Sequence, residues 1–445
     1  MNYCYLMPYR DKYIVYRPLR KLAFLANAAL VNYLETRLHR PGEAADLGNP
    51  AATFLDEINF FEPDPEPPER AAPDRAFQPV MAVLFPTTAC NFRCGYCYAS
   101  AGDGPPARLP LELGRRAIDL VRRNALNQGL DHFILGFHGG GEPSLESGLL
   151  RELAAHARSG PLPCRINLTS NGYWSADQRA WFLDNLDEIS LSLDGAQPTQ
   201  DRQRPLASGA GSFFEVLKTV AALDRKAFPY GVRLTVTDES VDLLPENIHF
   251  LCRETGCRTF QAEPAFNHGR AKKNHTALKN AEKFVRAFLE AHDLARRAGR
   301  ELYYSGARPW VLTERFCQAP EKALIVTPEG FLTSCYEVCG PAHILADRFF
   351  FGRMTAAGGL DLTHGRREAL ERSLAERRTE CEACFCYWHC AGDCPSKAFS
   401  SSEMERCLMN RNITRELIVR RMIENDGLGV EPFPETSNRE CRWFE

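Results

Sequence analysis

The sequence predicts an α/β fold built around a parallel β-sheet. Segments with the pattern of buried strands alternate with segments of helical periodicity between residues 80 and 300, as expected of repeated β/α units. The predicted strands are Val80–Phe85, His132–His138, Arg165–Thr169, Glu188–Leu193, Tyr230–Thr237 and Arg258–Glu263. The predicted helices are Leu111–Asn127, Ser147–Arg158, Ala176–Leu186, Ser212–Arg225, Leu244–Thr255 and His275–Ala298. Six units suit an open partial barrel or a flat doubly wound sheet, and the alternation alone does not separate the two.

Ahead of the repeated units, residues 1–61 predict a small α+β module and residues 62–79 a linker. The elements predicted in the module are strands at Tyr13–Tyr16 and Lys21–Leu25 and helices at Ala28–Leu38 and Asn49–Phe60. The linker is rich in proline and charge, a composition that favours an extended, solvated chain. It therefore marks the boundary of the α/β region, residues 80–300.

The composition of the chain limits the classes of partner and the cellular compartment that we expect for it. The formal net charge is −3 over 445 residues, which leaves no basic footprint for nucleic acid. No apolar run is long enough to span a membrane, and the first residues lack the basic-then-apolar order of a signal peptide. We therefore expect a cytoplasmic protein without a membrane or nucleic acid partner. In that reducing compartment, metal clusters explain the 17 cysteines better than disulfides do.

Three cysteines follow the first predicted strand in the pattern C-x3-C-x2-C. They are Cys90, Cys94 and Cys97. Three thiolates can hold a cubane iron–sulfur cluster while leaving its fourth iron without a protein ligand. A zinc site is the alternative, but zinc usually takes four protein ligands in structural sites. An open iron is useful where a small molecule must be bound and reduced on the cluster.

A glycine-rich turn, Gly139-Gly140-Gly141-Glu142, follows the second predicted strand. Together with the three cysteines it resembles the radical S-adenosylmethionine (radical SAM) superfamily. The resemblance implies a partial (β/α)6 barrel. It also implies that the open iron and the glycine backbone bind the methionine part of S-adenosylmethionine, and that the bound cofactor yields a 5′-deoxyadenosyl radical. Without the cysteines, the glycines could form only a tight turn.

Polar residues at the ends of later strands extend this resemblance. It implies that cofactor contacts come from Tyr96, Ser170, Asn171, Ser192 and Arg204, and substrate or catalytic contacts from His138, Asp194 and Glu263. Arg204 would pair with the methionine carboxylate, although Gln200 stands where many relatives have histidine. The alternatives are ordinary strand-to-helix turns, a solvated Arg204, a capping Glu263 and a satisfied core His138.

The C-terminal part carries a second cysteine series, Cys317-x12-Gly330-x4-Cys335, then Cys381-x2-Cys384-x5-Cys390-x3-Cys394, then Cys407. Segments 323–326 and 331–333 flank Pro328-Glu329-Gly330 and predict a hairpin. The series resembles the SPASM domain, which would occupy residues 301–425 before a tail at 426–445. A zinc ribbon is the alternative.

The SPASM resemblance implies two auxiliary clusters. Cys381, Cys384, Cys390 and Cys407 would hold the distal one, and Cys317, Cys335 and Cys394 the one nearer the barrel. No cysteine lies between Gln318 and Val326, where many relatives supply the fourth thiolate. Either Cys339 or Cys386 replaces it, or one iron is open. The expected cofactors are therefore S-adenosylmethionine and three 4Fe–4S clusters.

The resemblance implies an enzyme that modifies a ribosomally made peptide by an oxidative crosslink, a thioether or a carbon–carbon bond. A formylglycine-generating maturase of the sulfatase type and a peptide epimerase, with Cys339 as a hydrogen donor, are alternatives. A non-catalytic iron–sulfur electron-transfer or scaffold protein is an alternative of another class. The expected partners are a precursor peptide, whose leader residues 1–61 could bind, and an electron donor such as flavodoxin or ferredoxin.

Overall fold

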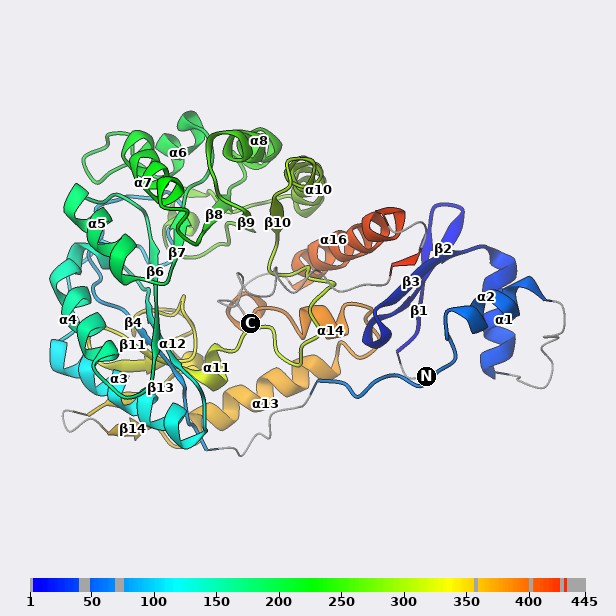
Figure 1. Ribbon diagram of the computed structural model, residues 1–445, viewed down its shortest axis with the longest axis horizontal. Coiled ribbons are helices and arrows are strands. Elements are labelled where there is room, and N and C mark those ends of the chain that lie inside the picture. Colours follow the sequence, from blue (N-terminus) through cyan, green and yellow to red (C-terminus); the bar gives the residue numbers. More distant parts are fainter. Residues whose placement is uncertain are drawn as a thin grey trace.

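The computed structural model describes residues 3–39, 49–68, 76–355, 359–399, 403–424 and 428–429. Two sheets organise this part of the chain, one of eleven strands and one of four. Figure 1 shows the large sheet at one end of an elongated molecule and the small N-terminal sheet at the other.

Six parallel strands form the centre of the large sheet in chain order. They are β4 (Met81–Leu84), β5 (Phe133–Phe137), β6 (Cys164–Ser170), β7 (Glu188–Ser192), β8 (Tyr230–Val236) and β9 (Thr259–Pro264). Leu84 pairs with Phe137, and Phe137 pairs with Leu168, so the carboxyl ends of neighbouring strands meet at one rim. The six predicted strands are confirmed, each within two residues of its predicted bounds.

The crossover helices lie along the outer side of this sheet, as Figure 1 shows for α3, α4, α5, α7 and α8. The helices are α3 (Leu111–Asn127), α4 (Ser147–Arg158), α5 (Ala176–Asn185), α7 (Phe213–Arg225), α8 (Leu244–Glu254) and α10 (Ala281–Arg297). Helices on one side only are expected of a partial barrel, whereas a doubly wound sheet carries them on both. The fold class predicted from the sequence is therefore confirmed.

One helix boundary was predicted wrongly. The helix expected at 275–298 begins at Ala281, where the Asn280 side chain accepts a hydrogen bond from the Lys283 amide as an N-cap. His275 has a left-handed backbone (φ 56°) that ends a separate short helix, α9 (Gly269–Asn274). A further short helix, α6 (Gln197–Gln203), was not predicted.

The large sheet continues beyond the six strands at both edges. β10 (Glu301–Tyr303) pairs in parallel with β9, and β11 (Ala323–Val326) pairs in parallel with β4. The antiparallel strands β12 (Phe331–Thr333), β13 (Phe350–Met354) and β14 (Leu360–Leu362) follow β11. The predicted hairpin is thus confirmed as β11–β12. Because β11 joins β4 in parallel, the β11–β12 turn lies beside the chain that follows β4, where the Phe85 amide donates to the Val326 carbonyl (3.0 Å).

The small sheet has the order β1-β2-β3-β15. Its strands are β1 (Tyr5–Tyr9), β2 (Lys12–Arg17), β3 (Leu22–Ala26) and β15 (Leu428–Gly429), and the module also contains α1 (Ala28–His39) and α2 (Pro50–Glu57). Both predicted helices and the strands at β2 and β3 are confirmed. β1 was missed because it contains Pro8, which weakens a strand signal but is tolerated at a sheet edge.

Two buried side chains fasten the N-terminal module to its surroundings. Arg17, at the end of β2, donates to the Glu62 carbonyl (3.0 Å) and to Asp64 (2.6 Å) at the start of the linker. The Tyr16 hydroxyl donates to Nε2 of His389, whose Nδ1 donates to the Val311 carbonyl (2.8 Å). Residues 62–68 form no helix or strand. Residues 76–79, at the end of the predicted linker, likewise form no helix or strand. Residues 69–75 of the linker and residues 430–445 of the tail lie outside the described residues.

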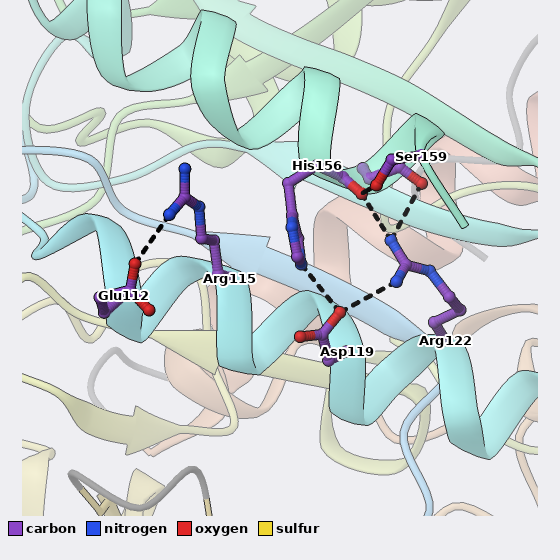
Figure 2. A network of polar contacts seen from close by, with 7 residues as sticks. Glu112, Arg115, Asp119, Arg122, His156 and Ser159 are labelled. Atoms are coloured by element: carbon purple, nitrogen blue, oxygen red, sulfur yellow. Dashed lines mark hydrogen bonds and ion pairs between the residues drawn. The ribbon is translucent and has the colours of Figure 1, made fainter.

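A polar network joins α3 to α4 on the outer surface (Figure 2). Asp119 accepts hydrogen bonds from Arg122 Nη1 (2.9 Å) and from His156 Nε2 (2.8 Å). Arg122 Nη2 also donates to the His156 carbonyl (2.6 Å), which accepts from the Ser159 hydroxyl (2.9 Å) as well. The network closes the end of α4, where backbone carbonyls lack helical partners.

On the opposite side, α10 packs against the long helix α16 (Glu403–Glu424), as Figure 1 shows. Arg420 of α16 donates twice to the Asp293 carboxylate of α10, at 2.8 and 3.1 Å. No helix in the described ranges is long and apolar enough to cross a membrane.

His292, in the α10–α16 contact, predicts an acid-sensitive interface. Burial lowers the pKa of His292 to about 4 from 6.5. Between these values the unfolded chain binds a proton that the folded chain does not, so stability falls as pH decreases, by at most about 1.4 kcal/mol per pH unit. We expect His292→Gln to reduce the loss of melting temperature between about pH 7 and about pH 5. The same change at the exposed His249 should leave that loss as it is, and equal losses in both variants would contradict the prediction.

Candidate active site

A cavity of about 350 Å3 opens at the carboxyl ends of the barrel strands. Two sets of cysteines line it. Cys90, Cys94 and Cys97 come from the loop after β4, and Cys317, Cys335 and Cys394 come from the C-terminal region. The pairing of β11 with β4 places Cys317, which precedes β11, and Cys335, which follows the antiparallel β12, toward the amino end of β4. Cys90 to Cys97 follow the carboxyl end of β4, so the two sets line the cavity from opposite ends of this strand.

Backbone hydrogen bonds hold the loop that carries the first three cysteines. Its Arg93 and Gly95 amides donate to the carbonyls of Pro205 (2.8 Å) and Gln203 (2.9 Å). On the other side, Arg270 Nε donates to the Cys94 carbonyl (2.9 Å), and the Arg270 amide donates to the Cys97 carbonyl (2.9 Å). The loop is thus anchored to the end of α6 and to α9 before any ligand is bound.

The glycine-rich turn packs directly on this loop. A Cβ atom on Gly141 would lie 2.2 Å from the Ala89 carbonyl oxygen, so only glycine fits there. Gly139 has φ 141° and lies against Phe85. The Glu142 amide donates to the same Ala89 carbonyl (2.8 Å). All four residues of the turn, Gly139 to Glu142, line the cavity.

Glu142 also joins two strand ends. Its buried carboxylate accepts hydrogen bonds from the Ser144 amide (3.0 Å), the Ser170 hydroxyl (2.6 Å) and the Asn171 amide (2.8 Å). Ser170 ends β6 and Asn171 follows it, and both line the cavity with Glu142. These predicted cofactor contacts therefore form one preorganised rim.

Glu142→Gln is expected to loosen that rim. A carboxamide accepts through only one of its two terminal atoms, so at least one of the three buried donors loses its acceptor. We expect a loss of about 1–3 kcal/mol in unfolding free energy, measured as a lower melting temperature. Glu215→Gln, a change at a half-buried position on α7, is a control for the loss of one charge, and an equal loss there would contradict the prediction.

Tyr96, Arg204 and Asp194 form a buried network beside the cysteine loop. The Tyr96 hydroxyl donates to Asp194 (2.6 Å) and lies 2.5 Å from Arg204 Nη1. Asp194 also accepts from the Thr235 amide (3.0 Å) and from Gln203 Nε2 (2.8 Å). Tyr96 and Arg204 line the cavity, whereas Asp194 is not among its lining residues. The carboxylate predicted to contact substrate therefore positions the two residues in front of it.

Gln200 and Ser192 complete this part of the site. Gln200 Oε1 accepts from the Asp194 amide (2.9 Å), and its Nε2 donates to the Ser212 hydroxyl (3.0 Å). Gln200 thus holds the turn after β7, at the position where the resemblance led us to expect histidine. Ser192, at the end of β7, lines the cavity.

The two remaining predicted substrate contacts, His138 and Glu263, also line the cavity. Burial lowers the pKa of His138 to about 3, so its ring is neutral near pH 7. In the described part of the chain, His138 Nδ1 has no hydrogen-bond partner, and its ring centroid lies 5.1 Å from that of Tyr336. Glu263 accepts from Gln261 Nε2 (2.9 Å) and from the Ser305 amide (2.8 Å).

The cavity cysteines have surroundings that suit cluster ligands. The Cys90 and Cys317 sulfurs each accept from the amide two residues later, at 3.4 Å, and Cys335 accepts from the Glu337 amide. Such hydrogen bonds stabilise thiolates and tune iron–sulfur clusters. Burial raises the pKa of Cys90 to about 12 and of Cys317 to about 11. These thiols are therefore protonated unless a bound cation stabilises the thiolate.

The other predicted set, Cys381, Cys384, Cys390 and Cys407, lies near α14 (Tyr387–Cys390) and α16. The Cys381 and Cys390 thiols each lie within electrostatic range of Cys407. Asn410 of α16 donates to the Cys390 sulfur (3.3 Å). This set is thus gathered apart from the cavity that the other six cysteines line.

Cys386 and Cys339 occupy different places. The Cys386 thiol donates to Cys384 and lowers the pKa of Cys384, so Cys386 belongs with the distal set. Cys339 packs behind the glycine turn, where a Cβ on Gly140 would lie 3.1 Å from the Cys339 Cβ. Its thiol donates to the Tyr336 carbonyl (3.3 Å). Neither cysteine is among the residues that line the cavity.

Across the described ranges, no three His, Cys, Asp or Glu side chains converge tightly enough to hold a single metal ion. The thiolates of a cubane cluster each bind a different iron, so they stand farther apart than the ligands of one ion. Amide donors at the sulfurs and buried, protonated thiols are compatible with cluster ligation, and the cysteine sets fit the predicted groups on those grounds.

Comparisons with known proteins agree with this geometry. A family model described as "Radical SAM superfamily" matches residues 84–251. The chain is 28% identical over 281 residues to the "Sporulation killing factor maturation protein SkfB" of Bacillus subtilis, covering 61% of this chain and 64% of SkfB. It is 25% identical over 355 residues to the "Serine-type anaerobic sulfatase-maturating enzyme" of Klebsiella aerogenes, covering 76% and 85%. The chain thus spans less than two thirds of the length of SkfB.

Solved structures show the same fold. The structure "Native anSMEcpe with bound AdoMet and Cp18Cys peptide" superposes with a TM-score of 0.58 at 17% identity, covering 78% of this chain and 98% of the other. Streptococcus suis SuiB bound to the precursor peptide SuiA superposes with a TM-score of 0.51 at 12% identity, covering 88% and 94%.

Proposed function

Because the chain belongs to the radical SAM superfamily, we propose that it is a maturase that modifies a peptide or protein and closes an oxidative crosslink in it. The crosslink is a thioether or a carbon–carbon bond in a ribosomally made precursor peptide. The precursor reaches the cavity through the rim, and the N-terminal module at residues 1–61 is the proposed contact for its leader. Flavodoxin or ferredoxin is the proposed electron donor.

One observation supports this proposal above the others: both cavity cysteine sets face the same cavity of about 350 Å3. When bound, the cofactors supply a 5′-deoxyadenosyl radical that abstracts hydrogen and an acceptor for the electron released as the crosslink closes. A substrate side chain held between the two sets is within reach of both functions. An oxidative crosslink needs both, because it removes two hydrogen atoms.

The chain's own residues would prepare this site. Cys90, Cys94 and Cys97 would hold the first cluster, and the backbone of Gly139–Gly141 would accept the ammonium of S-adenosylmethionine. Arg204, fixed by Tyr96, would bind the carboxylate of the cofactor. The apolar and aromatic parts of the cavity wall would exclude water from the substrate radical.

A formylglycine-generating maturase is the second candidate, because the sulfatase-maturating relative is matched over 85% of its length. An epimerase has less support, because Cys339 lies behind the glycine turn and does not line the cavity. A non-catalytic scaffold protein does not explain why a glycine turn packs on a loop whose three cysteines would leave one iron of a cluster without a protein ligand.

The test uses the full chain, reconstituted anaerobically with iron and sulfide, with S-adenosylmethionine and a reductant. Synthetic peptides encoded by short reading frames beside its gene serve as substrates. We expect 5′-deoxyadenosine and a peptide that has lost two hydrogen atoms. Conversion of cysteine or serine to formylglycine, in place of a crosslink, would support the second candidate function. Intact clusters without any 5′-deoxyadenosine would overturn the enzyme proposal.

A further inference from the structure

We propose that Glu337 is the fourth protein ligand of the auxiliary cluster at Cys317, Cys335 and Cys394, and that it binds through a carboxylate oxygen. The inference rests on the proposed function in one respect, namely that a cluster forms at these three cysteines. It goes further by assigning the coordination position for which the chain supplies no cysteine.

Neither candidate cysteine shares the cavity with these three, although the Cys339 thiol lies within electrostatic range of Cys335. Cys386 is hydrogen-bonded to Cys384 in the distal set and is buried among apolar residues of the N-terminal sheet and α16. Cys339 packs behind Gly140, and its thiol donates hydrogen bonds to the carbonyls of Tyr336 (3.3 Å) and Glu337 (3.4 Å). The cavity that Cys317, Cys335 and Cys394 line is lined by neither.

Glu337 lies at the cavity that Cys317, Cys335 and Cys394 line. It follows Cys335 by two residues on the loop after β12, its amide donates to the Cys335 sulfur, and it lines the cavity with all three cysteines. The Ser396 hydroxyl donates to Glu337 Oε2 (3.0 Å) and lies 3.3 Å from the Cys394 sulfur. A single hydroxyl group therefore separates the carboxylate from one of the three thiols.

Two residues of the C-terminal region hold the Glu337 carboxylate. Oε2 accepts from Ser396 and pairs with Lys397 Nζ at 2.6 Å. Both of these partners hold the same oxygen of the carboxylate. Glu337 itself lines the cavity. Ligating carboxylates are commonly oriented by such hydrogen bonds to the outer oxygen.

The competing interpretation is a structural ion pair in which Glu337 only neutralises Lys397. An ion pair with Lys397 accounts for the charge of Glu337 but not for its place in the cavity that the three thiols line. Three thiolates and one carboxylate complete the four coordination positions of a cubane cluster. An oxygen ligand would also leave one iron distinct from the other three.

The experiment compares Mössbauer and reduced-state EPR spectra of the full chain carrying Cys90→Ala, Cys94→Ala and Cys97→Ala, reconstituted with isotopically enriched iron. This background removes the cluster of the first loop. We expect one iron site of the nearer cluster with a higher isomer shift than the rest. Glu337→Gln should change that site and the EPR signal, whereas Glu337→Cys should convert it into a fourth thiolate-bound site at unchanged iron content.

Glu263→Gln removes another carboxylate of the same cavity and should leave both spectra unchanged. Unchanged spectra in both Glu337 variants would overturn the inference. Loss of the nearer cluster in the Cys339→Ala variant, together with an intact nearer cluster in the Glu337→Gln variant, would also overturn it. If Cys317→Ala does not lower the iron content, no cluster forms at these cysteines. That result overturns the proposed auxiliary cluster itself and is distinguishable from failure of the ligand assignment.

Discussion

Cleavage of S-adenosylmethionine by the reduced protein is expected to fall to background when Cys94 is replaced by alanine. Cys94 is buried and lies in the cavity between Cys90 and Cys97, and its carbonyl is fixed by Arg270. Losing an outer-shell partner of a metal ligand typically costs about 10–100-fold in affinity or activity, and losing a ligand itself should cost more. We therefore expect a loss of more than about a hundredfold in the rate of 5′-deoxyadenosine formation.

The matched control is Cys257→Ala. Cys257 is also a buried cysteine, but its thiol lies against the backbone at the start of β9 and does not line the cavity. This control should keep its rate of 5′-deoxyadenosine formation and its iron content. If Cys94→Ala retains the full iron content and more than about a tenth of the activity, the three-cysteine site is not the site of cleavage.

Replacing Gly141 with alanine is expected to damage both folding and cofactor binding. The new methyl group would lie 2.2 Å from the Ala89 carbonyl oxygen and 2.6 Å from that of Thr87. Both neighbours are backbone atoms, so no side-chain rotation relieves the clash and the glycine turn must move off the cysteine loop. Overpacking of this kind costs about 1–3 kcal/mol or more. We expect a lower melting temperature and a loss of S-adenosylmethionine binding in equilibrium dialysis.

Gly148→Ala is the control for this change. Gly148 is exposed in α4, and an added Cβ would meet no atom within 4 Å. Alanine has the higher helix propensity, by about 1 kcal/mol, so this variant should be as stable as the parent chain or more stable. Equal losses of binding in the Gly141 and Gly148 variants would show that the contact with Ala89 is not the cause.

Much of the fold was predictable because its signals are local. Six buried strands and their helices repeat along the chain, and each predicted helix between Leu111 and Glu254 ends within two residues of its predicted bound. The β11–β12 hairpin follows from apolar segments around Pro328-Glu329-Gly330. The errors arose where tertiary or capping interactions decide, as at the left-handed His275 and at the proline-containing edge strand β1.

The candidate site was predicted less completely. The three-cysteine motif and the glycine turn were recognised from the sequence, and the superfamily that they indicated is confirmed by the match over residues 84–251. The anchoring role of Arg270 was not predicted, because it depends on contact between α9 and a loop far away in the chain. Asp194 was expected at the substrate but is held behind Tyr96 and Arg204, since side-chain direction at a strand end depends on neighbouring strands.

By itself, the sequence determined which residues carry the chemistry and in what order the elements follow, because strand periodicity and cysteine spacing are properties of short segments. The tertiary structure alone decided which of those residues share a cavity. Parallel pairing of β11 with β4 joins the C-terminal region to the barrel. Cys317 and Cys335 then line the same cavity as Cys90, whereas Cys339 and Cys386 do not. Such pairing joins distant segments through backbone hydrogen bonds and burial, which no local pattern in the sequence encodes.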